Sequence, residues 1–518
     1  MIGGIVVLVA LVLAGLLLLG TRASIESDPE ALAHVSLPFV GGTIGRVSVV
    51  TGAHSAPVPV SLRSQQIWPR RLLSAHQTVT VEVTVRRPGW IAWLAGSTER
   101  VRLTLTTPSA SLAAHYLTLH GGAPLTLHFK EPIEAIAYGP ADHLVRHDLS
   151  RPMSQIRLPR TAEAGTVSVA AIPRRWETAA PTVVSWFPAG SAGVAVASPA
   201  PGSKITPNTT ITLTFSGPVA QTLHTLPPLS PAAEGSWRPA GSHAIAFVPH
   251  GYGYGLGTKV SLALPAGLRL VGGSSTSSSS TATWQVPSGS PLRLQQLLAT
   301  LGYLPLRFNA HAPVGSTPAA QVAAAVHPPA GNFTWRYGNV PAALRSAWAP
   351  GTSGAITQGA LMAFQDRHGL TADGSPGAAT WKALIKAAAE GRGTSSGYTY
   401  VMVDKEASPE SLTLWHSGKT IFTTLVNTGI DSAPTASGTY PVFEHVPVTT
   451  MSGTNPDGSH YSDPGIQYVS YFNGGDALHA FTRGQYGSPQ SLGCVEMDLS
   501  SAAKVYPYTP IGTLVHVA

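Results

Sequence analysis

The chain has 518 residues, enough for three or four domains at about 150 residues each, and only 11% of them are charged. Its 53 glycines and 44 prolines favour turn-rich β modules over long solvent-exposed helices. The formal net charge of +7 suits an anionic environment such as a cell wall or a membrane surface. The basic residues form no stripe along the sequence, which disfavours a nucleic-acid-binding protein.

The first segment of the chain is apolar throughout. Residues 2–20 contain no charged side chain and are just long enough to cross a bilayer. No Lys or Arg precedes this run and no clear small-residue cleavage site follows it, so we favour an uncleaved membrane anchor at residues 1–22 over a signal peptide. We expect the rest of the chain to lie outside the cytoplasm, on the cell-wall side, or to be secreted if the segment is cleaved.

Short runs of alternating apolar and polar residues dominate from residue 36 to residue 286. In TVTVEVTVRR (78–87), every second residue is a valine, while threonine or glutamate occupies the other face. Breaks rich in proline and glycine separate such runs, a pattern typical of antiparallel sandwiches. The sequence therefore predicts two Ig-like β-sandwiches, at residues 30–195 and 196–287, which we expect to act as spacers.

The pattern then becomes helical. In PLRLQQLLATLGYL (291–304), leucines recur at the spacing of one helix face. A second piece, TQGALMAFQDRHGLTADGSPGAATWKALIKAA, begins at residue 357 and has the same character. Together these pieces resemble the two halves of the small three-helix peptidoglycan-binding domain, here at residues 289–392 with an insertion at 306–356. The resemblance implies binding to glycan strands or stem peptides; a module that serves only for packing is the alternative.

The chemistry is expected near the end of the chain, which holds its only cysteine, Cys494, in SLGCV. An unpaired cysteine in an exported chain is either a reactive thiol or a small buried apolar residue. His479 stands fifteen residues earlier, in DALHAF, and an imidazole can take the proton of a thiol and return it to a leaving amine. Gly493 would let a substrate approach the backbone, and we expect the amides of Gly493 and Cys494 to be free to hold an oxyanion.

Residues 397–518 resemble the catalytic domain of the L,D-transpeptidases, the YkuD family. In that family a histidine is followed some fifteen residues later by Ser-x-Gly-Cys-Ile/Val, a pattern filled here by His479, Ser491, Gly493, Cys494 and Val495. The resemblance implies that Cys494 is the nucleophile and His479 its base, with the imidazole oriented by a backbone carbonyl near Ala480. It also implies that Ser491 supports the loop and that the Gly493 and Cys494 amides form the oxyanion hole.

Three positions depart from the family pattern. Leu492, Glu496 and Ala480 stand where the family often has His, Arg or Asn, and Gly. These differences leave the nucleophile and base in place but affect the acceptor side of the site. The family's flap corresponds to residues 451–475, and the resemblance implies substrate contacts from its aromatic residues: Tyr461, Tyr471 and Phe472. The alternative is that these rings only pack the loop.

The implied reaction needs no metal and no organic cofactor. The thiolate attacks a tetrapeptide stem of peptidoglycan, and an amine of a neighbouring stem resolves the thioester into a 3→3 crosslink. Resolution by water would make the enzyme an L,D-carboxypeptidase. A non-catalytic wall-binding protein is a third possibility, while a zinc peptidase is disfavoured because no H-E-x-x-H pattern occurs. The family is acylated by carbapenems at its cysteine.

The sequence thus predicts a multidomain, mainly β protein. Its expected parts are an N-terminal membrane helix, two Ig-like β-sandwiches, a small three-helix peptidoglycan-binding-like domain and a C-terminal β-rich catalytic domain. Its expected partners are peptidoglycan stem peptides, as tetrapeptide donor and amine acceptor, and the membrane.

Overall fold

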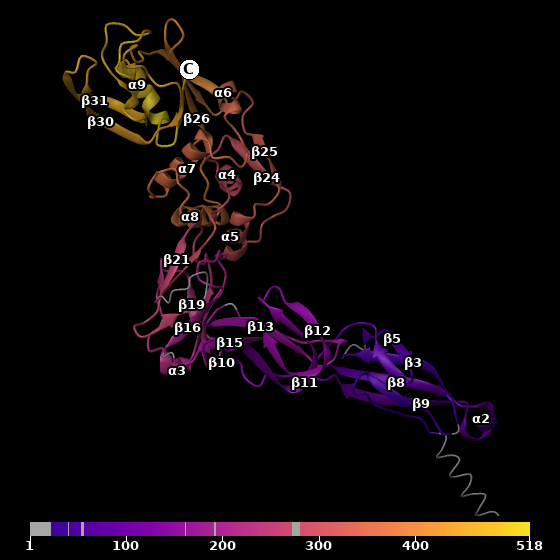
Figure 1. Cartoon of the computed structure of the whole chain (residues 1–518). Coiled ribbons are helices and arrows are strands. Elements are labelled where there is room, and N and C mark those ends of the chain that lie inside the picture. The colour runs from indigo at the N-terminus through magenta and orange to yellow at the C-terminus, as the bar shows by residue number, and fades with distance from the viewer. Residues whose placement is uncertain (1–21, 40, 53–55, 161, 191–192, 272–279) are drawn as a thin grey trace, which may run out of the picture. The chain divides into compact units, whose positions relative to one another are not determined.

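The computed structural model describes residues 22–39, 41–52, 56–160, 162–190, 193–271 and 280–518 (Figure 1). The chain divides into two compact units, the first built mainly from residues up to Ser198 and the second from most of the remainder. Within the described ranges, no helix is long and apolar enough to cross a bilayer. The anchor predicted at residues 1–22 lies, except for its last residue, outside the described part of the chain.

The first unit begins with strands that enclose one apolar core. One sheet has the order β1-β2-β6-β5 and another the order β4-β3-β8-β9. The valine face predicted on β8 is completely buried, which confirms the period-two pattern there. The bounds are β1 (Ser24–Ser27), β2 (Ala33–Ser36), β3 (Thr43–Thr51), β4 (Ala56–Pro57), β5 (Val60–Arg63), β6 (Gln66–Pro69), β8 (Thr78–Arg86), α2 (Gly89–Ala95) and β9 (Thr98–Thr106).

A second apolar core follows in the same unit, around a sheet with the order β10-β15-β13-β11-β12. The region predicted as one sandwich, 30–195, therefore has two separate buried clusters, because alternation marks the inward residues but not which strands share a core. The remaining bounds are β7 (Leu73–Ser74), β10 (Tyr116–Leu119), β11 (Leu125–Gly139), β12 (Val145–Leu158), β13 (Gly165–Ile172), β14 (Glu177–Thr178), β15 (Thr182–Pro188), β16 (Val194–Ser198) and β22 (Arg269–Leu270).

The residues from 199 to 286 supply further strands. An antiparallel sheet has the order β18-β21-β23, and β19 pairs with β20. Trp284 of β23 is 1% exposed, and its indole N–H donates to the Pro199 carbonyl at 3.0 Å. The bounds are β17 (Ile211–Phe215), α3 (Val219–Thr222), β18 (Leu229–Ser230), β19 (Gly235–Pro239), β20 (Ala244–Pro249), β21 (Lys259–Ala263) and β23 (Thr281–Gln285).

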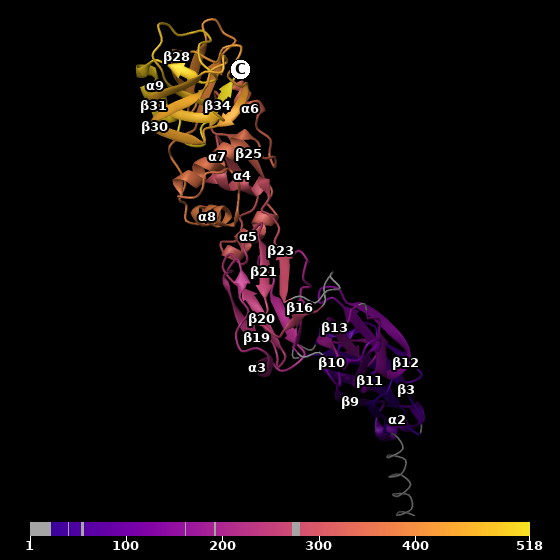
Figure 2. The same cartoon turned by 60° about the vertical axis from the view of Figure 1, so that its left-hand side comes forward.

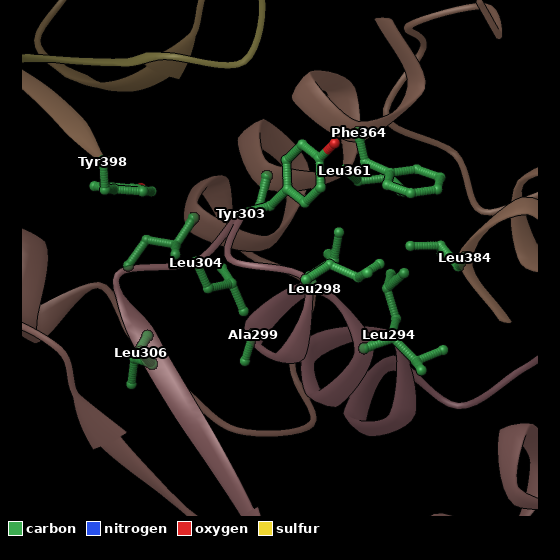
Figure 3. Close-up of a cluster of buried hydrophobic side chains, with 14 of the residues drawn as sticks. Leu294, Leu298, Ala299, Tyr303, Leu304, Leu306, Leu361, Phe364, Leu384 and Tyr398 are labelled. Carbon is green, nitrogen blue, oxygen red and sulfur yellow. The ribbon is translucent and has the colours of Figure 1, made fainter. Parts of the chain in front are cut away.

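The helical region begins at α4 (Pro291–Thr300), where the Ser290 side chain caps the first turn and Pro291 occupies its first position. The predicted leucine face is buried against the other helices, and Figure 3 shows Leu294 and Leu298 in one cluster with Phe364 and Leu384. The insertion is ordered, with β24 and β25 forming an antiparallel pair. The bounds are β24 (Leu306–Ala310), α5 (Pro318–Val326), β25 (Gly331–Trp335), α6 (Ala342–Ser346), α7 (Ala355–Arg367) and α8 (Ala378–Ala389).

The core of the helical region continues into the C-terminal strands. Tyr400, Trp415 and Leu514 belong to the same buried cluster as the leucines of α4. The indole N–H of Trp415 donates to the Asn339 carbonyl at 2.7 Å. A Cβ on Gly359 would collide with the backbone of Gly512, so α7 needs glycine there. Although residues 390–397 have the composition of a linker, the two regions they join are packed together.

The C-terminal region consists of two sheets around a second core of the unit. One sheet has the order β28-β27-β26-β34-β29 and the other β30-β31-β32-β33. The bounds are β26 (Thr399–Asp404), β27 (Ser411–His416), β28 (Lys419–Leu425), β29 (Gly438–Pro441), β30 (Glu444–Thr454), β31 (His460–Asn473), β32 (Asp476–Ala480), β33 (Val495–Met497), α9 (Leu499–Val505), a 3₁₀ turn (Tyr506–Tyr508) and β34 (Leu514–Val517).

Candidate active site

The parallel pairing of β32 with β33 brings the predicted histidine and cysteine to neighbouring strands. Leu478 pairs with Val495 and His479 with Glu496. Leu478 and Val495 point into the core between the sheets, so the residues beside them in sequence face the other way. Cys494, directly before Val495, therefore lies on the same face of the sheet as His479. The fifteen-residue spacing in the sequence corresponds to one crossing between adjacent strands.

The imidazole of His479 is buried, with 2% of the residue exposed. Its Nδ1 lies 3.0 Å from the carbonyl oxygen of Ala480. A carbonyl only accepts, so Nδ1 carries a hydrogen and donates it. Burial lowers the pKa of His479, which keeps the ring neutral and leaves Nε2 as an acceptor. This arrangement gives a ring with a fixed tautomer that can receive a proton from a nearby donor.

Cys494 packs against a buried cluster formed by Ile466, Val469 and Ala477. Burial raises its pKa to about 12, and the negative charges of Asp476 and Glu496 act in the same direction. The backbone amide of Ala477 has the opposite effect, because an N–H donor favours the thiolate. The Sγ atom donates to the Gly475 carbonyl at 3.6 Å, and among the described residues no hydrogen bond joins it to His479. The resting pair is thus a neutral thiol and a neutral imidazole.

Ser491 holds the loop that carries the cysteine. Its backbone N–H donates to the Thr428 carbonyl at 3.0 Å, and its carbonyl accepts from Ile430 at 3.0 Å. Its hydroxyl donates to the Cys494 carbonyl at 2.6 Å. The residue is 2% exposed, so these bonds are shielded from water. Ser491 therefore fixes the backbone of the cysteine on one side of the loop.

Gly493 has a φ of +114°, in the region that favours glycine, and a Cβ there would collide with Oδ1 of Asp476. Its amide donates to the hydroxyl of Ser491 at 3.2 Å. The expectation that this amide is free to hold an oxyanion is therefore wrong for this conformation. Pattern matching identified the glycine but could not tell that the serine two residues earlier would accept its N–H.

Glu496 and Arg483 form an ion pair beside the histidine. The guanidinium donates from Nε and Nη2 to the two carboxylate oxygens at 2.8 Å each, and from Nη2 to the Gln490 carbonyl at 3.1 Å. The Glu496 side chain is 5% exposed and the Arg483 side chain 29%. The charge of Glu496 raises the pKa of His479 and that of Arg483 lowers it, both less strongly than burial does. The sequence had marked Glu496 only as a departure, and nothing in it paired this residue with Arg483.

Asp476 is a further group that sequence reasoning missed. It accepts from the side-chain amide of Asn473 at 3.2 Å and from the backbone of Ala436 at 3.5 Å. Burial raises the pKa of its carboxyl, and its charge raises the pKa of the cysteine. Its position at the start of β32, three residues before the histidine, was the only available signal.

The three predicted aromatic contacts divide into two groups. Burial raises the pKa of Tyr461 and of Tyr471, and the thiolate form of Cys494 would add to both shifts, so both phenols lie within electrostatic range of the sulfur. Phe472 is 2% exposed and packs in the core between the sheets. Tyr471 packs against a different cluster, formed by Ile466, Val469 and Ala477, so Phe472 does not share the cleft with Tyr471. Its assignment as a substrate contact is corrected accordingly.

In the described ranges, no group of three or more His, Cys, Asp or Glu side chains is placed to hold a metal ion. The predicted site residues that come together are Cys494, His479, Ala480, Ser491, Gly493, Tyr461 and Tyr471. This arrangement offers a nucleophile, a neutral base with a fixed tautomer and a rigid loop. Such a set can carry out acyl transfer through a thioester.

Two regions of the chain match models of known protein families. Residues 398–517 match the YkuD family model, the L,D-transpeptidase catalytic domain. Residues 338–384 match the model of a peptidoglycan binding domain. The chain thus has a C-terminal region similar to the YkuD catalytic domain, preceded by a region similar to the peptidoglycan binding domain. These matches support a peptidoglycan-modifying enzyme that acts on the cell-wall side.

Solved structures with similarity to the chain include several L,D-transpeptidases. The enzyme from Mycobacterium smegmatis is 12% identical, covering 62% of this chain and 96% of its own, with a TM-score of 0.22. The catalytic domain of the Enterococcus faecium enzyme is 26% identical, covering 24% of this chain and 100% of its own, with a TM-score of 0.22. L,D-transpeptidase 3 from Mycobacterium tuberculosis, solved with a faropenem-derived adduct, is 12% identical. The match covers 62% of this chain and 96% of that enzyme, with a TM-score of 0.21. No curated protein matches the chain.

Proposed function

We propose that the chain is a cysteine-dependent L,D-transpeptidase that forms 3→3 crosslinks between peptidoglycan stem peptides. One observation carries the proposal: the only cysteine lies on the same sheet face as a buried, neutral histidine, within the region that matches the YkuD family. A neutral base and a thiol on adjacent strands are what thioester chemistry requires.

In the first step, Cys494 attacks the carbonyl of the third residue of a tetrapeptide stem. Nε2 of His479 takes the thiol proton as the sulfur–carbon bond forms, and returns it to the amine of the departing D-alanine. The Nδ1–H bond to the Ala480 carbonyl holds the ring in the tautomer that makes this possible. The amide of Ala477 stabilises negative charge on the sulfur.

In the second step, the side-chain amine of a neighbouring stem attacks the thioester and restores the thiol. The backbone amide of Cys494 is the proposed oxyanion donor, while the Gly493 amide and the Ser491 hydroxyl keep the loop in place. Tyr461 and Tyr471 are the proposed substrate contacts, because both phenols lie within electrostatic range of the sulfur. Water in place of the amine would give an L,D-carboxypeptidase product.

The other parts of the chain are proposed to place this chemistry at the wall. The peptidoglycan-binding match at residues 338–384 supports binding of wall polymer by the helical region. The apolar run at residues 2–20 supports a membrane anchor, with the bulk of the chain on the outer side.

The test uses the full chain and disaccharide–tetrapeptide monomers, with products separated by mass spectrometry. A 3→3 dimer with released D-alanine supports the transpeptidase, and a tripeptide product alone supports the carboxypeptidase. Cys494→Ala should abolish both products and also the mass adduct formed with a carbapenem. Undiminished turnover by Cys494→Ala would refute the assignment, and no product from the wild-type chain would favour a wall-binding protein without activity.

A further inference from the structure

One end of the first unit presents aromatic side chains to solvent. The helix α2 joins β8 to β9 and lies at the end of this strand pair in Figure 1, and Figure 2 shows it next to β9. Trp90 is 59% exposed and Trp93 82% exposed. Ile91 between them is 2% exposed and attaches the helix to the unit. Two largely exposed tryptophans on one short helix form an apolar surface that is typical of a binding site.

A third aromatic residue lies at the same end. Phe39 is 99% exposed and precedes a glycine pair that touches the base of α2. A Cβ on Gly41 would meet Cγ of Pro88, the residue before the helix, at 3.5 Å. The backbone N–H of Gly41 donates to the Pro38 carbonyl at 2.9 Å, which closes the turn that carries Phe39. Phe39, Trp90 and Trp93 are called the aromatic tip below.

The helix of the aromatic tip is held by a specific set of bonds. Arg87 Nη1 donates to the carbonyl of Ala95, the last residue of α2, at 2.6 Å. Arg87 Nη2 pairs with Glu99 Oε2 at 2.9 Å, and these two side chains are only 9% and 18% exposed. The indole N–H of Trp93 donates to the Trp90 carbonyl at 3.0 Å. Hydrogen bonds and an ion pair therefore hold α2 and the indole of Trp93 in place.

The same bonds connect the aromatic tip to Ala23, which follows the apolar run in the sequence. The backbone N–H of Ala23 donates to Glu99 Oε2 at 3.0 Å, so Glu99 connects Ala23 to Arg87 and the end of α2. Gly20 is the last residue of the apolar run and stands three positions before Ala23. Three residues span at most about 11 Å. If residues 2–20 cross a bilayer, the surface of that bilayer lies within about 11 Å of this end, while its interfacial layer is itself about 5–7 Å thick.

Basic residues lie on the strands that lead to the aromatic tip. Arg86 ends β8, three positions before α2 begins at Gly89, and pairs in register with Thr98. Arg46 and Arg100 are the register partners of Thr84, two residues before Arg86, on β3 and β9. All three are exposed. Glu99, the acidic residue at this end of β9, is paired with Arg87. Tryptophan at the headgroup level with arginine facing anionic lipid is the side-chain combination that membrane interfaces favour.

We propose that the aromatic tip docks on a phospholipid bilayer with anionic headgroups, with Trp90, Trp93 and Phe39 entering the interfacial layer and the arginines facing the headgroups. This inference rests on the proposed membrane anchor only for its position near the bilayer. The tip is a second attachment, and it fixes the orientation of the first unit on the membrane, which a single attachment would leave free.

The test reconstitutes the full chain into phosphatidylglycerol–phosphatidylcholine vesicles whose acyl chains are brominated near the headgroup. Bromine quenches tryptophan only on contact, and 2 of the 11 tryptophans belong to the tip, so we expect about one fifth of the emission to be lost. Trp90→Ser/Trp93→Ser should abolish this loss, and Trp93→Ser alone should reduce it. Trp237→Phe, a control on β19, should leave the loss unchanged. An equal thermal midpoint for the variants and the wild type verifies that the tip substitutions leave the fold intact.

Alkaline carbonate extraction of the same vesicles separates this inference from the proposed anchor. Wild-type chain that resists extraction but shows no quenching refutes the aromatic tip and leaves the anchor standing. Chain that is extracted by carbonate, yet is quenched before extraction, refutes the anchor and supports the tip. Quenching that is the same in pure phosphatidylcholine vesicles would overturn the role of the arginines.

Discussion

Removing Arg483 should have a larger effect on the catalytic region than removing any exposed cation. Arg483→Ala leaves the carboxylate of Glu496 at 5% exposure without its partner and breaks three donated hydrogen bonds. An unpaired buried charge costs about 3–5 kcal/mol, and the partial exposure of Arg483 puts the expected value near the lower end, about 3 kcal/mol. Arg392→Ala is the matched control, since its pair with Glu390 is exposed and should be worth less than about 1 kcal/mol.

The same variant should alter the titration of the histidine. Glu496 raises the pKa of His479 and Arg483 lowers it, so loss of Arg483 leaves the raising effect alone. The acidic limb of the rate profile should therefore move to higher pH in Arg483→Ala. Neutralising the carboxylate in Glu496→Gln should move it the other way. The double variant should be more stable than Arg483→Ala and should return the limb towards its wild-type position.

The measurement is the rate of carbapenem acylation of the cysteine, by mass spectrometry, between pH 4 and 8. Stability is followed as the urea concentration at which the reactive fraction falls to one half, which reports on the catalytic region rather than on the whole chain. If Arg483→Ala and the double variant have the same urea midpoint, the penalty does not come from an uncompensated carboxylate. If neither variant moves the acidic limb, the ion pair does not act on the histidine, and the reasoning fails.

Three further predictions concern the loop, the base and the domain boundary. His479→Gln should slow acylation by about 10²-fold at pH 7, with a deficit that shrinks as alkaline pH forms thiolate without help; a pH-independent deficit would mean that the ring only shapes the site. Ser491→Ala should destabilise the catalytic region by about 1–3 kcal/mol and so lower its urea midpoint, because the part-buried Cys494 carbonyl and the buried Gly493 amide lose their partner; unchanged stability would contradict the bonds assigned to the hydroxyl. Residues 397–518 expressed alone should aggregate, because this truncation exposes the buried side chains of Tyr400, Trp415 and Leu514. Residues 289–518 should remain soluble and reactive, and a soluble, fully reactive 397–518 would contradict the prediction.

Protonation of the histidine should also appear in the stability of the protein. The pKa of His479 is lower in the folded chain than the ordinary value of about 6.5 that it regains on unfolding. The unfolded state therefore binds a proton that the folded state does not, and stability should fall as the pH drops below about 6.5. His479→Gln should make this part of the profile flatter.

Local patterns in the sequence predicted local structure well. The alternation in residues 78–87 identified the buried face of β8, and the leucine spacing identified the buried face of α4. The histidine and the cysteine were predicted because their spacing and neighbours follow a pattern tied to one chemistry. In each case the predicted feature depends on residues that are close in the sequence or on one pairing between adjacent strands.

Pairings between distant residues could not be predicted in this way. Nothing within the first 195 residues indicated that their strands enclose two cores. The composition of residues 390–397 suggested a flexible connection, but Trp415 reaches across to the Asn339 carbonyl. The pairing of Arg483 with Glu496 depends on where the loop between β32 and β33 returns to the sheet, and no pattern in the sequence indicates that position.

The pKa shifts of the two proposed catalytic groups have one cause and a joint consequence. Burial lowers the pKa of His479 and raises that of Cys494, so a thiolate–imidazolium pair is disfavoured at rest. Proton transfer must then coincide with attack, when the charge passes from sulfur to the substrate oxygen near a backbone amide. A protein with this arrangement keeps its thiol protonated between turnovers. A protonated thiol is a poor nucleophile towards oxidants, which suits an unpaired cysteine in the extracytoplasmic location proposed for this chain.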